Sequence, residues 1–373
     1  MELERKRNEA GDSLNHHDST AEPEKRTGPL LPEVPTSERK IEHVRLCLEE
    51  EVGSRGVTPG FERYRFRHAA LPEVDFDDID LGTWFLGHAV RVPFLISSMT
   101  GGSAATGEIN MRLAEAAERR GWALGVGSVR AAVEKEELAA TFRVRDRAPS
   151  APVFANLGAV QLNYGFGVDD CRRAVDIAGA DLLVLHLNGL QEVFQPEGNT
   201  RFGDLLVRIE ELCRKLDVPV GFKEVGWGID GETARLLLDA GAAFIDVAGA
   251  GGTSWSQVEK FRSRDPVRRA AAEAFADWGN PTVECIREVK AAAPDCPLIG
   301  SGGIGSGVDA AKAIALGADL AGFGRGLLGA AVSSEAALDD RLAQVELELR
   351  TAMFGIGAAS IAELQATTRL IGI

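Results

Sequence analysis

The amino-acid sequence predicts an α/β fold of the (β/α)8 barrel class, in which eight parallel strands alternate with helices. From about residue 93 onward, short apolar runs typical of strands buried on both faces of a parallel sheet alternate with segments of helical periodicity. Polar residues or glycines follow these runs, as expected where strands end at a binding face. A doubly wound sheet is the main alternative, but the sequence shows no glycine-rich first turn with the acidic partner of a dinucleotide-binding fold.

The composition is that of an ordinary globular protein. The chain has 373 residues, of which 45% are hydrophobic and 26% charged, enough for one large domain or two small ones. Its formal net charge of −15 argues against nonspecific binding to nucleic acid or to an anionic membrane, but not against an anionic small-molecule substrate. The five cysteines lack metal-ligand spacing, and no N-terminal segment resembles a signal peptide. We therefore expect a cytoplasmic protein without a membrane span.

The first part of the chain differs in composition from the rest. Residues 1–37 are polar and proline-rich without apolar periodicity, and they are predicted to be a disordered extension. The barrel domain is assigned to residues 38–373, with 38–91 as an N-terminal helix and arm. Apolar residues recur at helical spacing in that helix, at Ile41, Val44 and Leu48. The mixed pattern from Tyr64 to Arg91 predicts a small hairpin or arm.

The regular part of the chain supplies the eight strands and most of the helices. The predicted strands are the apolar runs Pro93–Met99, Ala123–Ser128, Val153–Leu157, Leu182–Leu185, Pro219–Val225, Phe244–Val247, Pro297–Gly300 and Leu320–Phe323. The predicted helices are Glu108–Arg120, Val168–Ile177, Leu205–Leu216, Asp230–Gly241, Pro281–Ala293, Val308–Leu316 and Glu335–Phe354. The segment between Thr253 and Pro281 is an insertion to which no element is assigned.

Polar chemistry is concentrated at the end of the fourth predicted strand. His186, Asn188, Gln191 and Glu192 follow its apolar run directly. Such positions are where α/β barrels place their sites, and Glu192 could hold Mg²⁺, a hard cation that prefers carboxylate and phosphate oxygens. The alternative is that these side chains only satisfy loop backbone groups or, for Glu192, form a structural ion pair.

Other strand ends suggest a bound heterocycle with a phosphate. Gly302-Gly303 and Gly324-Arg325 follow the seventh and eighth strands, at the usual phosphate site of these barrels, although a glycine pair can also simply form a tight turn. An ammonium at the end of a buried strand, Lys223, needs an anionic or electron-rich partner, which a reduced flavin ring offers. Small polar groups suited to the edge of such a ring end four other strands: Thr100, Ser128, Asn156 and Thr253.

A basic cluster lies on the N-terminal helix. Arg39, Lys40 and His43 fall on or near one side of its first turn. Taken alone, such a cluster is usually a solvated helix face. Placed over a pocket, it could hold a diphosphate.

From about Glu38 to the C-terminus, the sequence resembles the flavin-dependent type 2 isopentenyl diphosphate isomerases. The motifs that carry this resemblance are Arg39-Lys40-x-x-His43, His68-Ala-Ala-Leu-Pro-Glu73, Ser98-Met-Thr-Gly-Gly102, Gly127-Ser-Val-Arg130, His186-Leu-Asn-Gly-Leu-Gln-Glu192, Lys223-Glu-Val-Gly226, Gly249-Ala-Gly-Gly-Thr253, Trp278-Gly279 and Ser301-Gly-Gly303. Several are specific, and their order along the chain makes a chance match improbable.

The resemblance implies a flavin-binding (β/α)8 barrel that interconverts isopentenyl and dimethylallyl diphosphate. It further implies reduced FMN, Mg²⁺, NADPH as the usual reductant, and a homo-oligomer, either a tetramer or an octamer. Substrate binding is expected at Arg39, Lys40, His43, Arg130, His186, Asn188 and Gln191. FMN binding is expected at Ser97, Ser98, Met99, Thr100, Ser128, Asn156, Lys223, Thr253, Gly303, Ile304, Gly305, Gly324 and Arg325. Glu192 is expected to bind the metal.

Three residues are expected to take part in the proton shift: Gln191, His186 and Lys223. An amide is a poor base, so Gln191 is expected to position groups or relay a proton. The chain departs from the family pattern at Val129, Gly189, Ala248 and Gly305.

Two other functions are compatible with the same barrel. An FMN-dependent 2-hydroxy-acid oxidase or dehydrogenase needs a histidine base late in the barrel, and no histidine follows His186. A non-catalytic protein that binds FMN or a diphosphate would bind flavin without isomerising the substrate.

Overall fold

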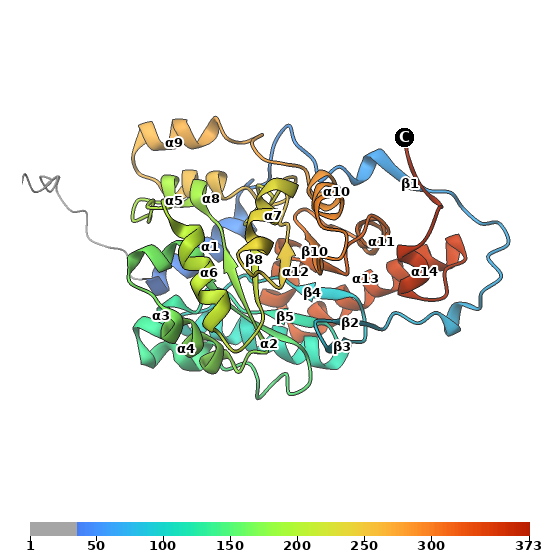
Figure 1. The fold of residues 1–373 in the computed structure, drawn as a ribbon, viewed down its shortest axis with the longest axis horizontal. Coiled ribbons are helices and arrows are strands. Elements are labelled where there is room, and N and C mark those ends of the chain that lie inside the picture. Colours follow the sequence, from blue (N-terminus) through green and yellow to red (C-terminus); the bar gives the residue numbers. More distant parts are fainter. Residues whose placement is uncertain (1–35) are drawn as a thin grey trace, which may run out of the picture. The chain divides into compact units, whose positions relative to one another are not determined.

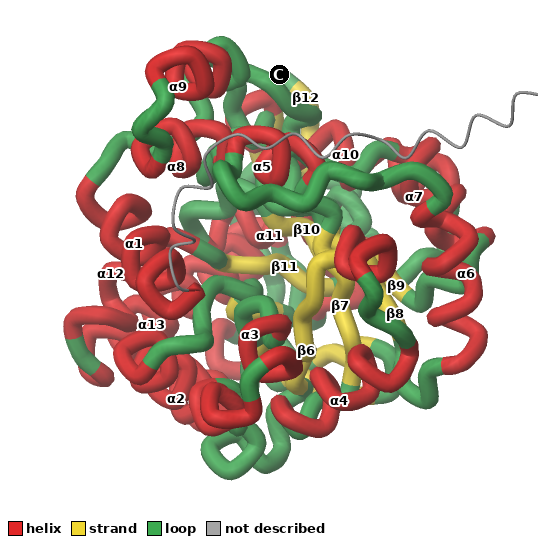
Figure 2. Tube along the Cα trace, turned by 90° about the vertical axis from the view of Figure 1, so that its left-hand side faces the viewer, coloured by secondary structure: helices red, strands yellow, loops and turns green. Residues whose placement is uncertain are grey.

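Eight parallel strands close into a barrel in the computed structural model, which describes residues 36–373. Each strand pairs with its neighbour in chain order, and the last, β11, pairs with the first, β4, so the barrel has no free edge. The predicted (β/α)8 fold is therefore confirmed (Figures 1 and 2). The predicted extension, apart from its last residues, lies outside the described residues.

The observed elements follow the predicted order. The barrel strands are β4 Phe94–Ile96, β5 Ala123–Gly125, β6 Val153–Gly158, β7 Leu182–His186, β8 Val220–Lys223, β9 Phe244–Asp246, β10 Leu298–Ser301 and β11 Leu320–Phe323. The longer helices between and after them are α2 Ala104–Arg120, α4 Val168–Ala178, α6 Leu205–Lys215, α7 Gly231–Asp239, α10 Thr282–Ala292, α11 Gly307–Ala315, α12 Arg325–Ser333 and α13 Glu335–Ile356. Short helices are α3 Arg130–Glu134, α5 Gly189–Phe194 and α14 Ile361–Gln365.

Among the longer helices that lie between and after the strands, two differ most from the prediction. Helix α2 begins at Ala104, four residues before the expected Glu108, because Ser103 and Thr106 form a capping box that satisfies backbone N–H groups at the helix start. Helix α12 was not predicted, since its glycine- and alanine-rich sequence has little periodicity. Its first residue is Arg325, directly after β11.

The predicted N-terminal arm contains a hairpin of β2 Thr83–Phe85 and β3 His88–Val90. Phe85 packs inside the barrel, with its ring centroid 5.6 Å from that of Phe244 and 6.1 Å from that of Phe154. Phe154 and Phe244 lie at the starts of their strands, so the hairpin fills the amino-terminal end of the barrel. The carboxyl end is left for a ligand. A second small sheet pairs β1 Tyr64–Phe66 with β12 Leu370–Gly372 near the C-terminus.

The insertion after β9 folds into two helices, α8 Trp255–Arg262 and α9 Pro266–Glu273. Helix α1, Thr36–Glu49, packs against α8 through a small apolar cluster of Leu46, Val52 and Val258. Figure 2 shows α1, α5 and α8 grouped at one end of the barrel. The N-terminal helix and the insertion thus form one structure beside the strand ends. Of the helices described, none has both the length and the apolar character needed to cross a membrane.

Candidate active site

A cavity of about 720 Å³ opens at the carboxyl ends of the barrel strands. Every residue predicted above to bind substrate, flavin or metal lines it, including the basic residues of α1 and the polar residues that follow β7. The structure therefore brings together side chains more than 280 residues apart in the sequence, from Arg39 to Arg325. Their individual roles remain predictions.

The inner end of the cavity is a polar layer at the tops of the strands. The residues that line this layer are Ser97, Asn156, Lys223 and Ser301. Gly322 leaves room between Ser97 and Ser301. A Cβ at Gly322 would lie 2.7 Å from Ser301 Cβ and 2.8 Å from Ser97 Oγ. The hydroxyls of Ser97 and Thr100 are buried and have no hydrogen-bond partner among the described residues. Unpartnered buried hydroxyls beside an open space fit the polar edge of a flavin ring.

The glycine-rich loops after β9 and β10 form a cradle of exposed backbone. Gly303 has φ +70°, and a Cβ there would lie 2.4 Å from Pro59 Cγ and 2.8 Å from the backbone of Gly251. Only glycine fits that position without a shift of the surrounding backbone. Helix α12 begins at the same place, and its N-terminal N–H groups and Arg325 favour an anion. This cradle fits the phosphate of FMN.

His186 lies between the inner and outer parts of the cavity. Its Nδ1 is 2.7 Å from Asn156 Oδ1. Burial, with the positive charges of Lys223 and Lys40, lowers the pKa of His186 to about 3. The ring is therefore neutral at neutral pH, so it can hydrogen-bond to a substrate but brings no positive charge to a diphosphate.

The outer end of the cavity is basic. Arg39 and Lys40 reach it from α1, and Arg130 reaches it from the start of α3. Arg39 forms an ion pair with Glu197 at 3.2 Å, and Arg130 with the exposed Glu134 at 2.7 Å. Burial, followed by the neighbouring Arg39, lowers the pKa of Lys40 to about 8. Cations gathered at one end of a cavity favour a multiply charged anion there.

Lys40 is expected to make diphosphate binding depend on pH. A bound diphosphate stabilises the protonated ammonium and raises its pKa, so binding is strongest below pH 8. The affinity is expected to fall by up to about tenfold per pH unit as the pH rises above that value. The dissociation constant of inorganic pyrophosphate, measured by calorimetry across this range, checks the prediction. In the Lys40→Arg variant the side chain stays positively charged, so the fall in affinity should begin at a higher pH. Identical pH profiles for the native protein and the variant would contradict the prediction.

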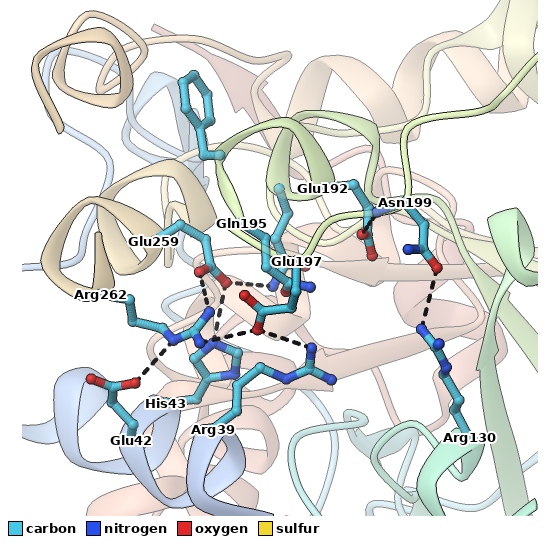
Figure 3. A network of polar contacts seen from close by, with 12 residues as sticks. Arg39, Glu42, His43, Arg130, Glu192, Gln195, Glu197, Asn199, Glu259 and Arg262 are labelled. Carbon is cyan, nitrogen blue, oxygen red and sulfur yellow. Dashed lines mark hydrogen bonds and ion pairs between the residues drawn. The ribbon is translucent and has the colours of Figure 1, made fainter. Parts of the chain in front are cut away.

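A buried ionic network that the sequence analysis missed joins α1, α8 and the loop after α5 (Figure 3). Glu259, fully buried, accepts hydrogen bonds from Arg262 at 2.6 Å and Gln191 at 3.2 Å, and its Oε1 lies 3.1 Å from His43 Nε2. Glu197 is shared between Arg262, at 3.1 Å, and Arg39. The acid and base at i, i+3 on α8 were the available signal, within a segment to which no element had been assigned.

The charges of this network follow from burial and pairing. Burial alone would raise the pKa of Glu259, but its partners His43 and Arg262 outweigh that effect and lower it to about 2. Burial also lowers the pKa of His43, although the Glu259 carboxylate opposes that fall. Arg262, which stays protonated, is the permanent cation beside Glu259. The contact between His43 Nε2 and Glu259 ties α1 to α8, and the substrate-binding role expected of His43 stays a prediction.

Replacing Glu259 with glutamine is expected to lower the free energy of unfolding by roughly 3 kcal/mol, because it removes the one fully buried carboxylate that pairs with Arg262 and leaves that guanidinium with only the part-exposed Glu42 and Glu197. Urea denaturation at neutral pH measures this loss. The pH dependence of this stabilisation also follows, because the pKa of Glu259 is lower in the folded protein than in the unfolded chain. The stabilisation is fully present above the unfolded pKa of about 4.3 and is lost as the pH falls toward 2. The exposed pair Arg45–Glu49 is the control, since Glu49→Gln should cost about 0.5 kcal/mol or less. Equal losses in the two variants would contradict the prediction.

The same network fixes the amide of Gln191. Its Nε2 donates to Glu259, and its Oε1 accepts from Asn188 Nδ2 at 3.2 Å. An amide held from both ends has one orientation and little freedom to rotate. Gln191 is thus suited to position a neighbouring group, in line with the role expected of it.

Glu192 faces the cavity in a setting rich in oxygen atoms. Its two carboxylate oxygens accept from Asn188 Nδ2, at 2.9 Å, and from the backbone N–H of Asn199. The side-chain carbonyl oxygens of Asn188 and Gln161 are buried nearby without a partner among the described residues. These are the donors Mg²⁺ prefers. In the described part of the chain, no group of three or more His, Cys, Asp or Glu side chains could hold a metal, so a bound diphosphate would have to complete its coordination.

Comparison with known proteins places this geometry in a family. A family model described as FMN-dependent dehydrogenase matches residues 35–156 and 195–370. A protein from Oceanobacillus iheyensis named isopentenyl-diphosphate delta-isomerase is 53% identical, over 90% of this chain and 96% of its own. One of the same name from Nostoc sp. is 53% identical, over 88% of this chain and 94% of its own.

Solved structures agree on the fold. A mandelate oxidase variant with a monooxide FMN adduct superposes with a TM-score of 0.60 at 22% identity, covering 89% of this chain and 99% of the other. At that identity the likeness concerns the barrel alone. The family model and the similarity along nearly the whole chain carry the assignment: the chain belongs to the FMN-dependent dehydrogenase family and, within it, to the type 2, FMN-dependent isopentenyl-diphosphate delta-isomerases.

Proposed function

We propose that this protein is an isopentenyl-diphosphate delta-isomerase that uses FMN to move the double bond of its substrate. The observation that carries this proposal is one cavity with two different ends. Its inner end joins Lys223, the free hydroxyls and the glycine cradle, which suit a flavin, and its outer end carries Arg39, Lys40 and Arg130, which suit a diphosphate. An alkene attached to that diphosphate would lie between them, beside Gln191.

The residues of the cavity have distinct tasks in this proposal. Reduced FMN, when bound, supplies a nitrogen able to exchange a proton with the alkene carbon. Lys223 stabilises the negative charge of the reduced ring, while Gln191 orients the reacting group through its fixed amide. Glu192 holds Mg²⁺ on the diphosphate. The neutral ring of His186 donates or accepts a hydrogen bond without adding a competing charge.

The proposal extends to the reductant, the assembly and the compartment. The isomerisation has no net redox change, so NADPH would serve only to reduce the flavin. Assembly into a homo-oligomer would cover exposed apolar side chains, such as Leu71, Trp84 and Val267. All five cysteines are unpaired, as expected for the reducing cytoplasm.

The test is an assay with isopentenyl diphosphate in deuterated water, with photoreduced FMN and Mg²⁺ present. The proposal expects dimethylallyl diphosphate as the product and deuterium in both isopentenyl and dimethylallyl diphosphate. If the protein shows a flavin spectrum but forms no product and incorporates no deuterium, it is a non-catalytic binding protein and the proposal is wrong. Oxidation of a 2-hydroxy acid in the same preparation would favour the oxidase instead, although no histidine follows His186 to act as its base.

A further inference from the structure

Beneath the inner end of the cavity lies Asp246, a carboxylate with no role in the mechanism above. It is the last residue of β9 and is only 2% exposed. It does not line the cavity, but its neighbours in the barrel interior do. Burying a charged or polar group costs free energy unless it is paired, so the partners of Asp246 indicate what it is for.

A hydrogen bond ties Asp246 to the cavity wall. The Ser301 hydroxyl donates to Oδ1 at 2.5 Å, and the backbone N–H of Ala248 lies close enough to lower the pKa of the carboxylate. Ser301 and Ala248 both line the cavity. Ala248 has φ +39°, a left-handed conformation that costs an alanine roughly 1 kcal/mol. The carboxylate thus lies beside a strained turn at the start of the glycine-rich loop.

Asp246 also faces the charge of Lys223. The two residues are register partners on the adjacent strands β8 and β9, and paired residues of neighbouring strands project to the same side, here the barrel interior. Burial raises the pKa of Asp246, and the positive charge of Lys223 opposes that rise. In the described part of the chain no direct ion pair joins them, because the Lys223 ammonium donates to the Glu224 carbonyl. Lys223 therefore has an acidic group below it and the open cavity above it.

We propose that Asp246 is a positioning residue that offsets part of the Lys223 charge and so sets the reduction potential of the bound flavin. This inference rests on the proposed flavin site. A reduced flavin ring carries negative charge, which Lys223 stabilises and Asp246 opposes. Charges in a buried site act strongly on one another because the surroundings screen them little. Removing the Asp246 charge therefore stabilises the reduced flavin relative to the oxidised form.

The experiment measures the potential of FMN in the holoenzyme against a reference dye, for the native protein and for Asp246→Asn. The expected result is a shift of the oxidised–reduced equilibrium toward reduced flavin by about tenfold or more, which is roughly 30 mV upward for a two-electron couple. Asp246→Ser is the second neutral variant and should shift it in the same direction. Ser301→Ala is the control, because it removes a hydrogen bond to Asp246 without changing its charge. The shift in potential caused by Ser301→Ala should be smaller than half of the shift caused by Asp246→Asn.

The outcomes separate this inference from the proposed function. If both neutral variants keep a native flavin spectrum and an unchanged potential, Asp246 does not act on the flavin and the inference is wrong. Loss of FMN from both variants would also overturn it, since it would show a structural role alone. A native protein that binds no FMN would instead refute the flavin site on which the inference rests.

Discussion

Replacing Glu192 with glutamine is expected to lower kcat/KM for isopentenyl diphosphate by roughly a hundredfold, the loss typical of removing one electrostatic group from an active site. The change removes the only carboxylate proposed to hold Mg²⁺ against the diphosphate. It also replaces one accepting oxygen with an NH₂ group, which would face either the Asn199 N–H or the Asn188 amide, both of which donate. Both effects weaken the same end of the cavity.

Titrating Mg²⁺ into the assay separates the metal from the fold. The Glu192→Gln protein should need a higher Mg²⁺ concentration for half-maximal activity, while its flavin spectrum stays native because the glycine cradle is untouched. Glu134 is the matched control: its side chain also lines the cavity, but it is exposed and pairs with Arg130 within one helix turn. Glu134→Gln should leave the Mg²⁺ requirement as it is. An unchanged requirement in Glu192→Gln would show that the metal, if used, binds elsewhere.

The parts of the site that lie on strand ends could be predicted because the fold itself brings them together. In a parallel barrel, all carboxyl ends meet at one face, so a residue just after an apolar run has a known place in space. Lys223, His186 and Gly303 were found in this way, without knowledge of any contact. The basic cluster of α1 could be named but not placed, since no periodicity shows where a flanking helix will pack.

The parts that could not be predicted depend on side chains far apart in the sequence. His43 and Glu259 are 216 residues apart, and Arg39 and Glu197 are 158 apart. Neither pair leaves a local pattern, and Glu259 lies on α8, a short helix of weak amphipathic character in the insertion to which no element was assigned. Asp246 was missed for another reason. It lies within an otherwise apolar strand, and its partners, Lys223 and Ser301, come from the neighbouring strands β8 and β10.

Replacing Lys223 with methionine is expected to lower kcat by roughly a hundred- to a thousandfold, because it removes the ammonium at the strand tops that is proposed to stabilise charge on the reduced flavin ring. Methionine keeps a long, flexible apolar stem, so the wall of the cavity changes little in volume. The Lys223 side chain donates to the Glu224 carbonyl, which would lose that donor. The fall in activity should come with a lower FMN reduction potential.

Lys260→Met is the matched control, because Lys260 is also a partly buried lysine but pairs with Glu273 and does not line the cavity. Its effect on the potential should be negligible. The two variants should shift the FMN reduction potential in opposite directions: Lys223→Met should lower it, whereas Asp246→Asn should raise it. A double variant whose potential differs from the sum of the two single shifts would show that the residues act on each other as well as on the flavin. If Lys223→Met leaves the potential unchanged, the ammonium has only a structural role in the barrel wall and another group stabilises the reduced ring.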